Sequence, residues 1–147
     1  MESIKKGNYD ELTNRKIKQA QGRFEIVNDY PIEIIDGAHN YEGVEILLRN
    51  YENKYGHLNT DIFLGFKKGK DINNILNLII GKTNYNLHLI EDYTFFDQEI
   101  TKEIGYLLDK HGKNYKIVSL EQFKKNKNPS ILLGSLYLIG EYKKREL

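Results

Sequence analysis

Six short apolar runs, separated by longer amphipathic stretches, limit the possible folds of this chain more than any other feature. Each run is apolar at consecutive positions, which is typical of strands that are buried on both faces of a sheet. We expect strands at residues 24–27, 32–35, 61–65, 87–90, 115–118 and 130–134. The alternation with helical stretches predicts an α/β fold: a Rossmann-like three-layer sandwich, with a mostly parallel sheet of about six strands and helices on both faces.

The stretches between the runs carry apolar residues at helical spacing. Residues 41–55 are the clearest case, because Asn40 is of a type that caps helices and Gly56 of a type that ends them. Asp71 is expected to cap the next helix. Further helices are predicted at about residues 97–110, 120–125 and 135–144.

Composition narrows the range of functions. A net charge of +1 gives no reason to expect nucleic acid or an anionic membrane as a partner, and the lack of cysteine excludes disulfides, thiolate catalysis and cysteine zinc sites. Neither end shows the pattern of a signal peptide, and no apolar run approaches the roughly 20 residues of a membrane span, so a cytoplasmic location is expected. Residues 1–21 carry few apolar side chains, which predicts a linker or N-terminal helix ahead of a domain at residues 22–147.

Ligands of open α/β sheets bind beyond the carboxyl ends of the strands. The segment Asp-Gly-Ala-His-Asn at residues 36–40 follows one such strand and precedes a helix, whose N-terminus favours an anion. Asp36 and His39 are therefore the best candidate pair for a ligand site. From the residues alone, an Asx turn with a helix cap accounts for them equally well.

Other chemical signals are weaker. Ser135 lacks a Gly-x-Ser-x-Gly setting, so a helix cap is the favoured interpretation. The four histidines lack metal-ligand spacing, and His88 lies in a strand pattern where packing is expected. Neither a phosphate-binding P-loop motif nor Gly-x-Gly-x-x-Gly is present in the chain.

Four short segments follow one another in an order that is informative as a set. They are Gly-Arg-Phe-Glu at 22–25, Asp-Gly-Ala-His-Asn at 36–40, Gly65 with Lys70-Asp71, and Gly-Ser-Leu-Tyr-Leu-Ile-Gly at 134–140. This order resembles the C-terminal domain of the folylpolyglutamate synthase/dihydrofolate synthase family, in the Mur ligase superfamily. The resemblance covers about residues 9–147. Tyr41 stands where the family commonly has Pro, Gly69 where it has Asp, and Thr-Phe-Phe at 94–96 replaces a Pro-Arg pair.

The resemblance implies an ATP-dependent amide ligase that adds glutamate to a folate γ-glutamyl tail through an acyl phosphate. In that family the P-loop and the magnesium ligands belong to a larger N-terminal domain. ATP and Mg²⁺ would then be bound mainly by that partner domain, and this chain alone would be inactive, with no catalytic residue or metal ligand of its own. By position, the resemblance assigns nucleotide binding to Arg23 (phosphates), Asp36 (ribose), His39 and Asn40, and glutamate binding to His39, Lys70 and Ser135.

Two other interpretations stay open. The chain is alternatively a free-standing, non-catalytic Mur-ligase-like domain that binds a nucleotide, an amino acid or a protein, which Tyr41 and Gly69 favour. An unrelated small Rossmann-like enzyme has only the generic strand–helix pattern in its support. An in-frame P-loop domain encoded directly upstream would distinguish the ligase from both.

Overall fold

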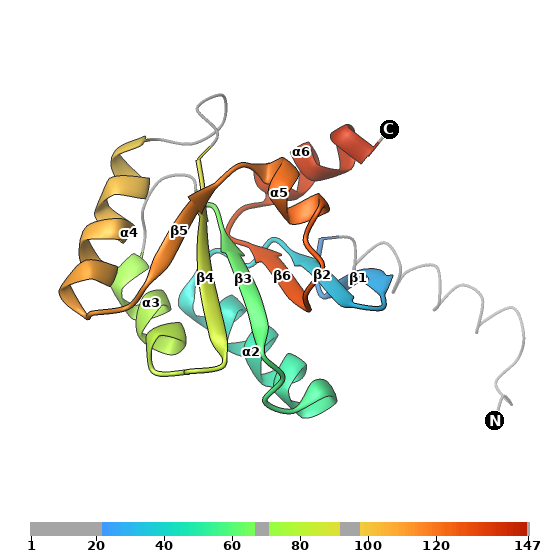
Figure 1. Cartoon of the computed structure of the whole chain (residues 1–147), viewed down its shortest axis with the longest axis horizontal. Coiled ribbons are helices and arrows are strands. Elements are labelled where there is room, and N and C mark those ends of the chain that lie inside the picture. Colours follow the sequence, from blue (N-terminus) through green and yellow to red (C-terminus); the bar gives the residue numbers. More distant parts are fainter. Residues whose placement is uncertain (1–21, 67–70, 92–97, 147) are drawn as a thin grey trace, which may run out of the picture.

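The fold is seen in a computed structural model, which describes residues 22–66, 71–91 and 98–146. Its strands form one sheet of six, in the order β1-β2-β6-β3-β4-β5 (Figure 1). The strands are β1 (Glu25–Asp29), β2 (Ile32–Asp36), β3 (Thr60–Leu64), β4 (Tyr85–Ile90), β5 (Tyr115–Val118) and β6 (Ser130–Leu133). The helices are α2 (Tyr41–Tyr55), α3 (Ile72–Ile80), α4 (Gln98–Lys110), α5 (Leu120–Lys124) and α6 (Leu136–Glu146). The linker or helix predicted for residues 1–21 lies outside the described residues.

The sheet is parallel except at one edge. Strands β2, β6, β3, β4 and β5 run in the same direction, and β1 pairs antiparallel with β2. The predicted α/β fold with a mostly parallel sheet of six strands is therefore confirmed. The first strand extends to Asp29 instead of ending near residue 27, so only Tyr30 and Pro31 connect it to β2.

Two hydrophobic cores cover the two faces of the sheet. On one face, alternate strand residues such as Ile34, Ile62 and Leu87 pack against α2, α3 and α4. On the other face, Ile35 and Phe63 pack against α5 and α6. Helix α5 lies near the carboxyl ends of the strands, and with only five residues it covers a small part of this second face. Figure 1 shows the amino-terminal halves of β3, β4 and β5 without a helix in front of them.

The ends of the helices follow the sequence signals in part. The Asn40 side chain accepts a hydrogen bond from the Gly43 N–H at 2.8 Å, and Gly56 follows α2 with φ of 71°, so both predictions are confirmed. The prediction for Asp71 is wrong in its mechanism. Asp71 occupies the cap position of α3 but makes no side-chain capping bond, because its carboxylate accepts from the Asn74 side-chain amide at 3.0 Å.

His88 is packed in the sheet, as its strand pattern predicts. Its ring stacks on Phe63, with 4.5 Å between the centroids and 10° between the planes. Burial lowers the pKa of His88 below its ordinary value of 6.5, and Lys116 acts in the same direction, whereas Asp61 opposes the shift. The imidazole is therefore held preferentially neutral in the fold.

We expect the free energy of unfolding to fall as the pH drops from about 7 toward 5. The unfolded chain takes up a proton on His88 below 6.5, whereas the folded chain resists it, so acid favours unfolding. The measurement is urea unfolding across this pH range. His88→Gln should flatten this part of the profile, and His111→Gln, which changes an exposed histidine, should not. Equal profiles for His88→Gln and the unmodified chain would contradict the assignment.

Candidate functional site

The carboxylate of Asp36, at the end of β2, holds two separate segments together. Its Oδ2 accepts a hydrogen bond from the Phe24 N–H at 2.9 Å, and its Oδ1 accepts from the Ala38 N–H at 2.8 Å. The first bond fixes the segment before β1, and the second forms the tight turn that leads into α2. Asp36 is only 8% exposed, so these bonds are made in a largely buried setting.

The segment before β1 has an unusual backbone. Phe24 has φ of 46°, a left-handed value that is rare for an aromatic residue, and Gly22 has φ of 74°. The Gly22 carbonyl accepts from the Gly37 N–H, which ties this segment to the turn after β2. Strained residues of this kind tend to lie at functional sites. Here the strained backbone places Arg23 beside the Asp36 turn.

His39 and Asn40 complete the turn. The Nδ1 of His39 lies 3.0 Å from the Gly37 carbonyl oxygen, to which its N–H donates, and this leaves Nε2 available to accept a hydrogen bond from a ligand. Asn40 caps α2. Both side chains are exposed, in contrast to Asp36.

These residues line one cavity of about 330 Å³, which we call the Asp36 cavity. It brings together four of the residues predicted to bind the nucleotide: Arg23, Asp36, His39 and Asn40. Its other wall includes Ile46 of α2 and Leu136 of α6, which are 51% and 56% exposed. The cavity therefore combines a polar floor with an apolar rim.

The remaining two predicted residues are not part of this set. Lys70 lies outside the described residues. Ser135 is 4% exposed and does not line the Asp36 cavity. Its Oγ accepts from the Tyr137 N–H at 3.0 Å, so the interpretation of Ser135 as a helix cap is confirmed and its contact with glutamate stays a prediction.

The electrostatics of the Asp36 cavity favour an anion near Arg23. Burial raises the pKa of Asp36, while the two backbone hydrogen bonds and the Arg23 charge oppose the rise. The N-terminus of α2 adds the partial positive charge of its free N–H groups. A phosphate group fits this combination of a guanidinium and a helix N-terminus.

A metal ion fits the Asp36 cavity less well. Mg²⁺ requires several oxygen ligands at short distance, and both Asp36 oxygens already accept from backbone N–H groups. Within residues 22–66, 71–91 and 98–146, no group of three or more His, Asp or Glu residues is arranged to hold a metal. The chemistry that the cavity supports is therefore anion and polar-group binding.

Two lining residues would be hard to identify from the sequence as part of the site. Phe24 contributes its N–H and its strained backbone, and Leu136 packs on Gly37 so closely that a Cβ at residue 37 would overlap its side chain. Any larger residue at 37 would therefore require the Leu136 side chain to move. Both lie in segments that carry the family resemblance, but the resemblance assigns neither of them a role.

One group of known proteins is similar to this chain in sequence. No family model matches the chain. The dihydrofolate synthase/folylpolyglutamate synthase of Bacillus subtilis is 25% identical over 130 residues, which are 84% of this chain and 30% of the relative.

Of the helices in the described part, none has the length and apolar character needed to cross a membrane.

Solved structures show the same relationship. The folylpolyglutamate synthase of Thermotoga maritima matches 84% of this chain with a TM-score of 0.67 and 24% identity. The bifunctional folylpolyglutamate synthase/dihydrofolate synthase of Yersinia pestis, complexed with AMPPNP and a Mn ion, matches 86% with a TM-score of 0.64 and 19% identity. The chain spans about 30% of the length of these relatives. Its neighbours in sequence and in structure are thus folylpolyglutamate synthases/dihydrofolate synthases, which it matches over their C-terminal part with a Mur ligase-like fold.

Proposed function

We propose that this chain acts as the C-terminal part of an ATP-dependent folylpolyglutamate synthase in the cytoplasm. The observation that carries the proposal is the convergence of Arg23, Asp36, His39 and Asn40 on one cavity. The relationship to the Bacillus subtilis enzyme and the AMPPNP bound in the Yersinia pestis structure support it.

In the proposed reaction, the γ-carboxylate of a folate glutamate tail takes the terminal phosphoryl group of ATP. The amine of the incoming glutamate then attacks this acyl phosphate, an amide bond forms, and inorganic phosphate leaves. The Arg23 guanidinium binds the ATP phosphates, where a fixed positive charge stabilises phosphoryl transfer. Asp36 and Asn40 face the nucleotide, with Asp36 at the ribose, while His39, Lys70 and Ser135 hold glutamate.

The proposal requires a second, P-loop-containing domain that supplies the phosphate-binding loop and the Mg²⁺ ligands. Ile46 and Leu136, which line the Asp36 cavity, are exposed apolar side chains. Their exposure supports the proposal that another domain covers this surface. Closure of that domain would exclude water from the acyl phosphate, which otherwise hydrolyses. The partner in this scheme is the N-terminal domain of the same enzyme.

The test combines this chain with a competent N-terminal P-loop domain, ATP, Mg²⁺, a reduced folate and glutamate. We expect release of ADP that depends on both proteins and on glutamate, together with a lengthened polyglutamate tail detected by mass spectrometry. Each protein alone should give only background. Failure of this chain to stimulate ADP release in the presence of an active N-terminal domain would refute the ligase proposal.

A second candidate function is nucleotide or amino-acid binding without catalysis. Tyr41, which stands at the first position of α2 beside the Asp36 cavity, favours it because the family commonly has Pro there. Calorimetry of the isolated chain with AMPPNP distinguishes the two. Binding of AMPPNP without any stimulation of ADP release would favour the non-catalytic domain.

A further inference from the structure

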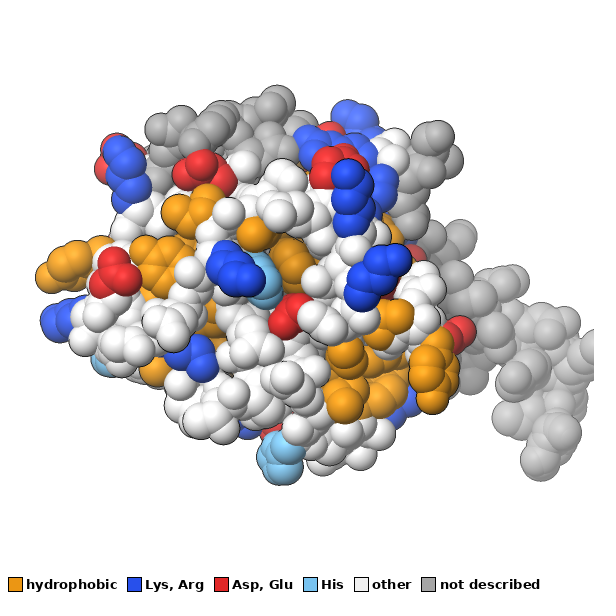
Figure 2. All heavy atoms as spheres, in the orientation of Figure 1, with side chains coloured by type: hydrophobic (Ala, Val, Ile, Leu, Met, Phe, Trp, Pro, Cys, Tyr) orange, Lys and Arg blue, Asp and Glu red, His pale blue; other side chains and the backbone are white. Residues whose placement is uncertain are grey.

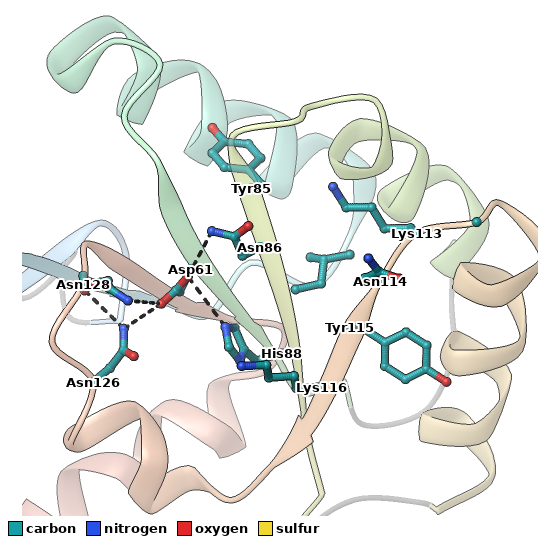
Figure 3. A pocket seen from close by; sticks show the side chains of 12 residues that line it. Asp61, Tyr85, Asn86, His88, Lys113, Asn114, Tyr115, Lys116, Asn126 and Asn128 are labelled. Atoms are coloured by element: carbon teal, nitrogen blue, oxygen red, sulfur yellow. Dashed lines mark hydrogen bonds and ion pairs between the residues drawn. The ribbon is translucent and has the colours of Figure 1, made fainter.

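A second cavity, of about 560 Å³, lies on the sheet face that α5 covers only in part. It is lined by the amino-terminal halves of β3, β4 and β5 and by the loops that precede β5 and β6 (Figure 3). The Asp36 cavity, in contrast, lies at the carboxyl end of β2. We call it the Asp61 cavity, and the lining residues used below are Asp61, Asn86, His88, Lys116, Asn126 and Asn128. Figure 2 shows separate charged side chains and a histidine over the middle of this face, with larger hydrophobic patches toward both sides.

One wall of the Asp61 cavity is rich in hydrogen-bond acceptors. Oδ2 of Asp61 accepts from the side-chain amides of Asn126 and Asn128 at 3.1 Å each, and Oδ1 accepts from that of Asn86 at 3.2 Å. Figure 3 shows these amide nitrogens converging on the carboxylate. In the described part of the chain, the side-chain oxygens of these three asparagines receive no hydrogen bond. A carboxylate offers about four acceptor positions. Three are used here, so Oδ1 of Asp61 keeps one, and the amide oxygens nearby add further acceptors for a donor-rich cation.

The opposite wall is positively charged. Lys116 on β5 is exposed and lies in register with His88 on β4, and Lys113 precedes the same strand. Lys113 donates to the Lys82 carbonyl oxygen at 3.3 Å, which fixes its position. The Nζ of Lys116 is held by no hydrogen bond or ion pair in the described residues, so it is available to an anion.

His88 lies between the two walls and brings the opposite charges close together. Its Nε2 is 3.7 Å from Oδ1 of Asp61, and the charge of Lys116 acts on the same ring from the neighbouring strand. Figure 3 shows Lys116 alongside His88. A ligand placed over this ring would have a negative and a positive partner within the reach of a small molecule.

Other occupants fit less well. The described residues include no cluster of three His, Asp or Glu side chains suited to a metal. Two lysines beside a buried carboxylate are a poor match for a nucleic-acid backbone, which selects for extended positive charge. An apolar ligand would leave the acceptor oxygens without donors, which is unfavourable.

We propose that the Asp61 cavity binds a small zwitterion of the α-amino-acid class. Asp61 and the asparagine oxygens receive its ammonium group, and Lys116 receives its carboxylate. The site is separate from the Asp36 cavity, so the proposal holds whether or not the chain acts as part of a ligase.

The test is a titration of the ¹⁵N-labelled chain, followed by amide chemical shifts, with glycine as the zwitterion. Glycine should shift the signals of residues 86–88 and 115–116 in a saturable way, whereas acetate and methylammonium at equal concentrations should bind far more weakly. Lys116→Gln should weaken glycine binding about tenfold, the loss expected for one charged hydrogen bond. Lys102→Gln, which changes an exposed lysine on α4, should leave it unchanged.

The other outcomes overturn the proposal. Equal binding of acetate would make the cavity a general anion site, and shifts confined to residues 36–43 would place the zwitterion in the Asp36 cavity. The absence of saturable shifts, or unchanged affinity in Lys116→Gln, would likewise overturn it. Because Lys116 is exposed, the variant should keep the fold, and its spectrum reports this directly.

Discussion

Gly134→Ala should destabilise the protein more than most single substitutions. Gly134 follows the central strand β6 with φ of 127°, which an L side chain rarely adopts. An added Cβ would lie 2.7 Å from the Gly65 carbonyl carbon and closer still to its oxygen, and backbone atoms cannot move aside cheaply. We expect a loss of more than about 3 kcal/mol in the free energy of unfolding, from strain and overlap together. Urea denaturation followed by circular dichroism measures it.

Gly140→Ala is the matched control. Gly140 lies inside α6, and an added Cβ would meet no atom within 4 Å. Alanine is favoured over glycine in a helix interior by roughly 0.5–1 kcal/mol, so this variant should be as stable as the unmodified chain or slightly more stable. If Gly134→Ala unfolds at the same urea concentration as Gly140→Ala, the close contact between Gly134 and Gly65 does not exist in solution.

Arg23→Ala should abolish ligation in the assay with the P-loop domain while leaving the fold intact. Arg23 is exposed, so its removal creates no cavity, and the Phe24 N–H that binds Asp36 belongs to the backbone. Under the proposed function its guanidinium stabilises the charge of the transferred phosphoryl group, and the loss of such an arginine lowers the rate by at least about 10³-fold. The measurements are glutamate-dependent ADP release and the urea midpoint of the same preparation.

Arg49→Ala tests whether any arginine near α2 would have this effect. Arg49 lies on α2 with its side chain 60% exposed, and its one interaction with another described residue is a surface ion pair with Glu45 at 3.5 Å. Such pairs contribute little, so activity and stability should both be unchanged. Full activity of Arg23→Ala, with Arg49→Ala as its reference, would show that Arg23 does not act on the phosphates.

The sequence predicted the layered fold well because the signals for it are local. Runs with apolar residues at consecutive positions mark strands buried on both faces, and β2, β3 and β6 follow them closely. The direction of β1 was not predicted, although a connection of two residues is too short for a parallel crossover. The failure of Asp71 as a side-chain cap has a local cause that residue type does not reveal, since its carboxylate accepts from the Asn74 side chain instead.

The residues of the candidate site also differ in whether the sequence alone could predict them. Asp36, His39 and Asn40 are adjacent in sequence and carry their own turn chemistry, so the chain itself points to them. Leu136 reaches the site only because β6 pairs with β2, and the left-handed backbone at Phe24 follows from its bond to Asp36. The Asp61 cavity was also not predicted, because it depends on how much of the sheet a five-residue helix leaves uncovered.

The two hydrogen bonds that Asp36 accepts from the chain itself have a consequence for the thermodynamics of binding. Both bonds form without a ligand, and they tie the segment before β1 to the turn before α2. The backbone around Asp36 is therefore preorganised, and under the proposed function little backbone conformational entropy is left to lose when a nucleotide binds. Less of the binding free energy would then be spent on ordering the two segments that Asp36 connects.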